Sequence, residues 1–325
     1  MAGEQQHYVP RFLLKNFTHG KKPKIFVYDK WNDKCFQTNI KNVAVENGFY
    51  DVEFENHVLT LEPGLANLDT NSSIIINKLT RNKAVKNLNE NEIVILAVFL
   101  AVQFVRTKEH RLRFSHIGKL FSEKLKDFGV TDTEAEKLKN ETNEIKKTKL
   151  YGLKSVIGAN DFVPHFLNKE WVLFETTRKF PFFISDNPIT LHNQIDHGFY
   201  GNIGLAVKGI EIYLPISSTL CLGILCPTIG DEFRKGYENI KMLDRINPDL
   251  ANSLMNNPLV ARAFCEGLVH GTPIKVIPDN VTFINSLQVM YSTRFVFCEG
   301  NTFELVKRMI NDKKKYRHGI KPTVS

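Results

Sequence analysis

The chain has 325 residues, a formal net charge of +8 and five cysteines. This length can bury a full hydrophobic core in one large domain or two modest ones, so the fold needs no disulfide or zinc site. Apolar residues make up 42% and charged residues 24% of the chain, which excludes an intrinsically disordered protein. The longest apolar run, Ile93 to Val102, is about half the length of a membrane span. Because the N-terminus also lacks a signal-peptide apolar core, we expect a soluble, cytoplasmic protein without a membrane partner.

Most of the net charge lies near the C-terminus. Between Lys307 and Lys321 there are seven bases and one acid, so this stretch carries +6 and the rest of the chain about +2. A basic run of this kind is typical of a solvated tail, and we assign the tail to residues 312–325. The alternative is a contact between the tail and nucleic acid or another polyanion.

The predicted elements of the first half are mainly helices that follow short strands. Pro10 is typical of the first turn of a helix, and Asn89 with Glu92 forms the pattern of a capping box ahead of the apolar run. The expected elements are a helix from Pro10 to Gly20, strands over 24–28, 34–39 and 49–54, and helices over 61–79, 89–108 and 131–151.

The second half is richer in strands. Residues 170–176 and 180–185 are predicted to form a hairpin, followed by strands over 210–214 and 220–225 and a helical region over 232–268 that Pro248 and Pro258 break. A helix over 281–291, a strand over 294–298 and a helix over 302–311 complete the chain. This order predicts an α+β fold in which a helical N-terminal half packs on a mixed or antiparallel sheet formed largely by the C-terminal half. We expect a single domain over 1–325, with a possible helical insertion over 232–271.

Familiar catalytic motifs are absent from the sequence. It contains no Gly-rich phosphate loop, no H-E-x-x-H and no G-x-S-x-G, so we do not expect a nucleotide-driven enzyme of a familiar kind. There is also no C-x-x-C pair and no zinc motif, although a divalent metal stays open as a cofactor. Four polar blocks lie beside apolar segments instead: Gln6, His7 and Arg11; Gln103 and Arg106; Asp186 and Asn187; and Asn285 with Arg294.

The residue types in these blocks suit the chemistry of an anionic substrate. His7 can transfer a proton near neutral pH, and Arg11 and Arg106 offer planar donors for phosphate or carboxylate. Residues 103 and 106 are three apart, so both side chains can lie on one helix face. Asp186, at the end of an apolar strand, could orient His7 or bind a metal. Each block also has an ordinary structural explanation, as a backbone-bonded arm, an ion pair, a turn or a buried amide.

The same blocks resemble the DUF4238 family, a set of uncharacterised, mainly bacterial proteins. The opening Gln6-His7-Tyr8-Val9-Pro10-Arg11-Phe12, with Leu14-Lys15-Asn16-Phe17 behind it, is similar to the start of that family. The later blocks are similar to its Gln-x-x-Arg-Thr helix (Phe99 to Thr107), its Ser-Asp-Asn-Pro turn (Ile184 to Pro188), its Leu-Pro-Leu-Ser segment (Leu214 to Ser217) and its C-terminal Asn and Arg (Asn285 to Arg294). The resemblance spans residues 5 to about 298. It implies a fold-wide relationship and supplies no reaction.

Two functions from different classes follow from these observations. The first is a hydrolase of a phosphodiester or other anionic substrate, such as a nuclease, in which His7, Arg11, Arg106 and Asp186 are catalytic. The substrate would then be bound by Gln6, Gln103, Asn187, Asn285 and Arg294. The second is a non-catalytic protein that binds a ligand or partner with the same pocket, and a third possibility is a buried network that only fixes the fold. The catalytic interpretation predicts that His7→Ala or Asp186→Ala abolishes activity and leaves the melting temperature close to wild type.

Overall fold

The computed structural model describes residues 4–20, 22–53, 58–113, 144–198, 201–255 and 257–319. Its architecture is α+β, as the sequence predicts. The predicted helix over 131–151 lies outside the described residues except for its last part, which belongs to α6 (Glu144–Ile157). Within the described residues, no helix combines the length and the apolar character needed to cross a membrane.

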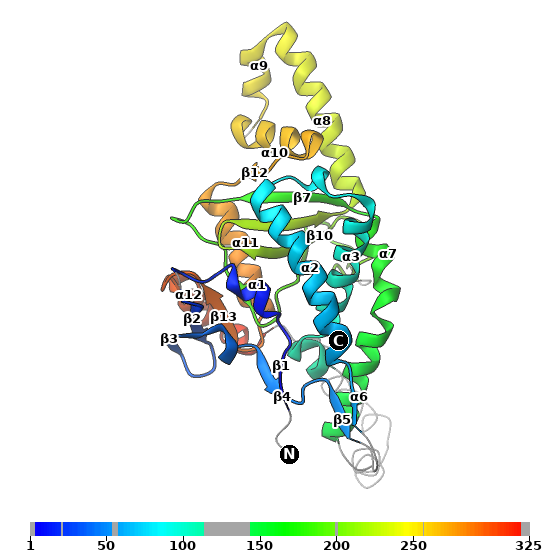
Figure 1. The fold of residues 1–325 in the computed structure, drawn as a ribbon. Coiled ribbons are helices and arrows are strands. Elements are labelled where there is room, and N and C mark those ends of the chain that lie inside the picture. Colours follow the sequence, from blue (N-terminus) through cyan, green and yellow to red (C-terminus); the bar gives the residue numbers. More distant parts are fainter. Residues whose placement is uncertain are drawn as a thin grey trace, which may run out of the picture.

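A five-stranded sheet from the second half of the chain forms the centre of the molecule (Figure 1). Its strand order is β12 (Ile274–Lys275), β7 (Glu170–Glu175), β11 (Leu220–Leu225), β10 (Ile210–Ser217) and β9 (Thr190–Asn193). The pairings are antiparallel apart from the parallel pair of β12 with β7. The strands predicted over 210–214 and 220–225 are therefore confirmed as neighbours.

Helices cover both faces of this sheet. Ile210, Ile212 and Leu214 alternate along β10 and belong to the core that also contains the apolar residues of α2 (Glu62–Asn82) and α3 (Glu90–Val105). Tyr213, between them, packs on the opposite face with α11 (Pro278–Tyr291), as the period of two in a strand requires. The predicted capping box of Asn89 and Glu92 is present at the start of α3.

A second sheet joins the two halves of the chain. Its order is β3 (Lys34–Asn39), β2 (Lys24–Asp29), β13 (Phe295–Cys298) and β8 (Ile184–Ser185), all antiparallel. Helix α12 (Glu304–Asp312) packs on it through Val306 and Ile310. The C-terminal half therefore does not supply all the strands of the two larger sheets, because β2 and β3 come from the N-terminal half.

The hairpin predicted for residues 170–176 and 180–185 is wrong. Strand β7 pairs with β11 and β12, whereas β8 pairs with β13 in the other sheet. Pro181 has no N–H to donate. The side chain of Asn285 instead binds the backbone on both sides of Phe182, accepting from the Phe183 N–H at 2.7 Å and donating to the Pro181 carbonyl at 2.9 Å.

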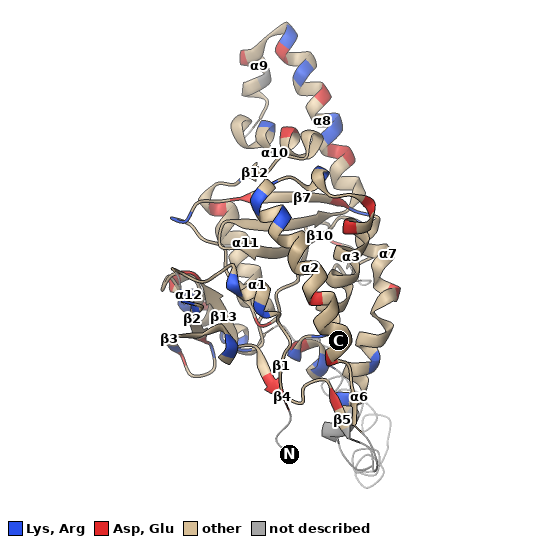
Figure 2. Cartoon of the chain, in the orientation of Figure 1, with Lys and Arg blue, Asp and Glu red and all other residues tan. Residues whose placement is uncertain are grey.

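A helical arm projects from one end of the five-stranded sheet (Figure 1). It consists of α8 (Pro227–Ile246), α9 (Pro248–Ser253) and α10 (Pro258–His270), each with a proline in its first turn, as Pro248 and Pro258 predict. Acidic and basic residues alternate along α8 (Figure 2). That this region is an insertion stays a prediction.

The N-terminal segment is held by the body of the protein, as its apolar residues require. Strand β1 (Gln5–His7) pairs with β4 (Val45–Asn47), which places His7 opposite Val45. Helix α1 (Arg11–Lys15) follows Pro10 and buries Leu13 and Leu14. The remaining described elements are short. They are the strands β5 (Asp51–Glu53) and β6 (Val58–Thr60), the helix α7 (Val163–Leu167) and the 3-10 turns η1 (Ile40–Asn42), η2 (Val85–Asn87), η3 (Gly158–Phe162) and η5 (Lys314–His318).

Candidate functional site

The N-terminal block contacts the helix that carries Gln103 and Arg106. The Gln103 Nε2 donates to the Tyr8 carbonyl at 3.1 Å, and the Phe12 ring lies 5.6 Å from that of Phe99. The expected facing of residues 103 and 106 is also confirmed, because the Arg106 Nε donates to the Gln103 Oε1 at 2.7 Å. Two of the four predicted blocks therefore come together.

Arg106 has one unused donor inside the protein. Its side chain has no exposed surface, and its Nη2 donates to the Asp69 Oδ1 at 2.8 Å. The Nη1 is buried and has no hydrogen-bond partner among the described residues. Burial is the largest single effect and lowers the pKa of Arg106, but the charges of Asp69, Tyr50 and Glu62 and the hydrogen bond to Asp69 together give a net upward shift, so the group stays cationic.

His7 carries the second unused atom. Burial, and then the charge of Arg11, lower the pKa of His7 below 6.5, while hydrogen bonding to the backbone of Ile40 and Lys41 and the charge of Asp69 act in the opposite direction. The imidazole is therefore mainly neutral at pH 7. Its Nε2 is buried and has no partner within the described part of the chain.

Two carboxylates on α2 complete this group. Glu62 and Asp69 share the inward face of α2 with Leu65 and Ser72 at helical spacing. Burial, followed by the charge of Asp69, raises the pKa of Glu62, and Arg106 opposes that shift. We call His7, Arg11, Glu62, Asp69 and Arg106 the His7 cluster.

Sequence reasoning missed both carboxylates of the His7 cluster. The signal was available, because a charged residue at an inward position of an amphipathic helix needs a buried partner. What the sequence could not give was the identity of that partner, since Asp69 and Arg106 are 37 residues apart and on different helices.

Three members of the His7 cluster are partly or fully accessible to solvent. The Asp69 side chain is 24% exposed, His7 is half-buried and Arg11 is exposed at the start of α1. Gln6 lies behind it as a structural residue, with its Nε2 donating to Asp51 at 2.8 Å and its Oε1 accepting from the Tyr50 N–H at 2.5 Å. Arg11 and Asp69 can therefore contact a ligand from solvent.

The remaining predicted residues form a different group, which the structure uses to hold the backbone. The Asp186 carboxylate accepts the N–H groups of Thr293, Arg294 and Phe295 at 2.8 to 2.9 Å. Asp186 therefore binds the first residue of strand β13 and the two residues before it, and not His7. Burial raises the pKa of Asp186, whereas these N–H bonds and the charge of Lys30 oppose the shift.

Asn187 and Arg294 also form hydrogen bonds within the fold. Asn187 donates to the Tyr291 carbonyl at 3.1 Å. Arg294 donates twice to Asp29, at 3.0 and 2.6 Å. Together with Asn285, described above, these residues bind backbone or a carboxylate within the fold. The charge of Asp186 contributes to the raised pKa of Tyr8 after burial, so this group is within electrostatic range of the N-terminal block.

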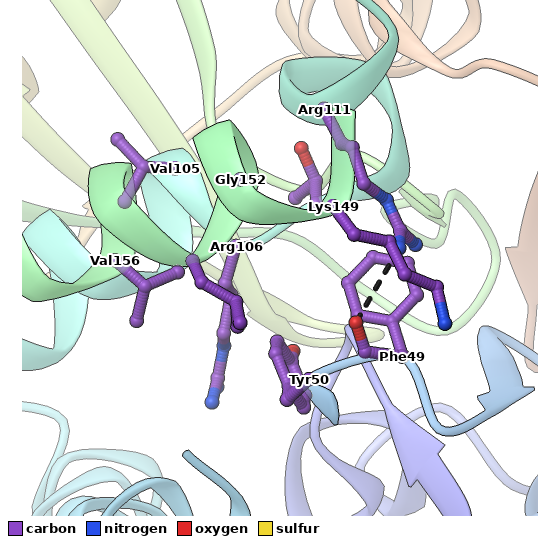
Figure 3. A pocket seen from close by; sticks show the side chains of 10 residues that line it. Phe49, Tyr50, Val105, Arg106, Arg111, Lys149, Gly152 and Val156 are labelled. Atoms are coloured by element: carbon purple, nitrogen blue, oxygen red, sulfur yellow. Dashed lines mark hydrogen bonds between the residues drawn. The ribbon is translucent and has the colours of Figure 1, made fainter. Parts of the chain in front are cut away.

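A small cavity lies beside Arg106 (Figure 3). Its volume is about 10 Å³, and Arg106, Arg111 and Lys149 are among its lining residues. The Arg111 guanidinium lies 3.4 Å from the centre of the Phe49 ring and donates to the Phe49 carbonyl at 3.3 Å, while Lys149 donates to the Gly48 carbonyl at 3.0 Å. This space holds about one water molecule, so it can solvate the cations but cannot hold a substrate.

No group of three or more histidine, cysteine, aspartate or glutamate side chains among the described residues has the geometry of a metal site. The His7 cluster therefore combines a neutral imidazole, a buried cation with a spare donor, an exposed arginine and two carboxylates. This inventory suits proton transfer next to a bound anionic group.

Comparison with known proteins adds one finding. The family model described as "Protein of unknown function (DUF4238)" matches residues 5–300. No curated protein and no solved structure matches the chain.

Proposed function

Because the chain belongs to the DUF4238 family, whose description assigns no activity, we propose its function from the geometry of the His7 cluster. The proposed activity is hydrolysis of a phosphodiester or another anionic substrate, such as nucleic acid. The observation that carries the proposal is the pair of buried atoms, His7 Nε2 and Arg106 Nη1, that lack a partner among the described residues. Buried polar atoms are nearly always satisfied within the fold, so unused capacity near a shared acid, Asp69, supports a binding role.

Each member of the cluster has a role in this proposal. The His7 Nε2 lone pair accepts a proton from water as the water oxygen attacks phosphorus. The buried Arg106 guanidinium, which has no exposed surface, stabilises the developing negative charge electrostatically, and Arg11 adds positive charge at the entrance. The bond to the leaving oxygen then breaks, and that oxygen receives a proton from the carboxyl group of Glu62, whose pKa is raised by burial and by the charge of Asp69. Asp69 is a positioning residue, because it holds Arg106 through the 2.8 Å bond.

The test uses the whole chain and three substrates. We would measure hydrolysis of bis(4-nitrophenyl) phosphate, single-stranded DNA and single-stranded RNA, each with Mg²⁺ and with EDTA. His7→Gln should reduce kcat by about 100-fold or more. His19→Gln is the matched control, because His19 is an exposed histidine whose side chain is 71% accessible, and it should leave kcat within about two-fold of wild type.

Two results would count against the hydrolase. One is the absence of turnover on all three substrates by the wild-type chain, and the other is equal turnover by the two histidine variants. Saturable binding of an anion that depends on Arg106 but gives no product would instead favour the non-catalytic ligand-binding role of the same cluster.

A further inference from the structure

A groove of about 510 Å³ lies on the face of the five-stranded sheet that α2 and α3 do not cover. Strands β7 and β10 form its floor, and helices α8, α10 and α11 form its walls. Protein interiors contain few voids larger than a water molecule, so a space of this size is not a packing defect. Sites for small molecules typically enclose about 300 to 1,000 Å³.

Aromatic rings surround this groove in an unbroken series of contacts. The ring centre of Phe174 on β7 lies 5.9 Å from that of Tyr213 on β10 and 6.0 Å from that of Phe264 on α10. The ring centres of Phe264 and Phe233 on α8 are 4.0 Å apart, and those of Tyr213 and Phe283 on α11 are 6.1 Å apart. Rings from two strands and three helices thus line the groove and provide apolar contact area for one ligand.

Space for the Phe174 ring depends on one glycine in the floor. A Cβ atom at Gly223 would lie 2.5 Å from the Phe174 ring and 2.9 Å from the Val172 side chain. Gly223 lies between Tyr213 and Val172 in the sheet. The absence of a side chain at this position therefore lets Phe174 lean over β11 and shape the groove.

One carboxylate is built into the same surface. Glu211 and Tyr213 are two residues apart on β10 and share the groove face, and the Tyr213 hydroxyl donates a hydrogen bond to Glu211. Burial raises the pKa of Glu211, whereas the Tyr213 bond and the nearby His192 oppose that shift. A buried carboxylate of this kind is stabilised by a cation that reaches it.

The charges at the mouth of the groove cancel, whereas the charge inside does not. Exposed Glu232 and exposed Lys275 stand at the rim and offset one another, which leaves Glu211 as the uncompensated acid among the lining side chains. The chain as a whole has a net charge of +8, so the negative charge of this aromatic groove is opposite in sign to that of the whole chain. Aromatic faces and a carboxylate together are the features that recognise organic ammonium groups.

We propose that this groove binds a small organic amine, in which an aromatic or aliphatic body occupies the ring-lined space and a protonated nitrogen pairs with Glu211. The site is separate from the His7 cluster, and its occupant does not depend on the proposed hydrolase activity.

Three indole probes that differ only in the end of the side chain test this proposal: tryptamine (cationic), tryptophol (neutral) and indole-3-propionate (anionic). Isothermal titration of the whole chain at pH 7 should give at least about ten-fold tighter binding of tryptamine than of tryptophol, and still weaker binding of indole-3-propionate. Glu211→Gln should reduce tryptamine affinity to that of tryptophol and leave tryptophol unchanged. The control Glu266→Gln replaces an exposed glutamate of α10 that does not line the groove and should have no effect.

Further variants separate this site from the other one and from a folding defect. Phe264→Ala should weaken tryptamine and tryptophol alike, and His7→Gln should leave both affinities as in wild type. The order of the three probes on the wild-type chain decides the question even where Glu211→Gln does not fold. Equal affinity for the three probes, no binding of any of them at millimolar concentration, or full tryptamine affinity in folded Glu211→Gln would overturn the proposal.

Discussion

At the scale of single residues, hydrogen-bonding capacity separates Asp186 from His7. The carboxylate of Asp186 already accepts three backbone N–H groups, whereas the His7 Nε2 has no partner among the described residues. Both residues looked alike in the sequence, where each stood beside an apolar segment. A sequence alone cannot show which polar group the surrounding backbone will satisfy, because those N–H groups lie more than 100 residues away.

Replacement of Asp186 by alanine should therefore destabilise the fold, contrary to the expectation from the sequence. Three buried N–H groups would lose their acceptor, at a total cost of about 3 kcal/mol or more. Urea unfolding of Asp186→Ala would measure this loss, with exposed Asp312→Ala as the control. An unfolding free energy within error of wild type would show that the backbone around Thr293 finds other partners.

His110 should make stability depend on pH below neutrality. Burial, and then the charge of Arg113, lower the pKa of His110 from 6.5 to about 4. Between these values the unfolded chain binds a proton that the folded chain does not, so the unfolding free energy falls as the pH falls from 6.5 towards 4. The full loss is on the order of 3 kcal/mol. His110→Phe should flatten the pH dependence in that window, and an unchanged slope would contradict the assignment.

At the scale of secondary structure, local signals predicted most elements of the described fold. The capping box starts α3, prolines start the helices of the arm, and the strands predicted over 210–214 and 220–225 are present as β10 and β11. The failure was at residues 180–185, where a side chain replaces the expected strand partner. That choice depends on Asn285, which is about 100 residues away, so no local pattern could reveal it.

Asn285→Ala tests this replacement of a strand by a side chain. The substitution removes the acceptor for the Phe183 N–H and the donor for the Pro181 carbonyl, which should cost about 2 kcal/mol or more of unfolding free energy. Asn311→Ala is the control, because Asn311 is exposed on α12. If chemical denaturation gives the same midpoint for both variants, the contacts of Asn285 do not hold this segment.

At the scale of the whole molecule, the C-terminal segment packs against Lys30, which follows strand β2. The buried Lys30 Nζ donates to the carbonyls of Val289, Ser292 and Tyr316 at 2.6 to 2.9 Å, and Arg317 donates to the carbonyl of Lys30 at 3.1 Å. Burial lowers the pKa of Lys30 to about 8. The first part of the basic tail therefore packs on the body, while Lys313, Lys314 and Lys315 are exposed, as their charge requires.

The exposed lysines give a selective test of nucleic-acid binding. Changing Lys313, Lys314 and Lys315 to Gln keeps Tyr316 and Arg317 in place, so the melting temperature should stay close to wild type. If the tail contacts duplex DNA, affinity should fall and the slope of log K against log salt should shrink by about 2 to 3 units. An unchanged slope would leave the tail as a solvated terminus, whereas truncation after Asp312 should destabilise the fold through Lys30.

The pH dependence of turnover tests the central claim most directly, because it reports the proton-transfer group itself. We predict that kcat/KM for bis(4-nitrophenyl) phosphate rises with pH through a pKa below 6.5, since the neutral form of His7 is the active one and burial lowers its pKa. In His7→Gln that acidic limb should disappear from whatever activity remains. A wild-type profile without this limb, or the same limb in His7→Gln, would contradict the assignment of His7 as the catalytic base.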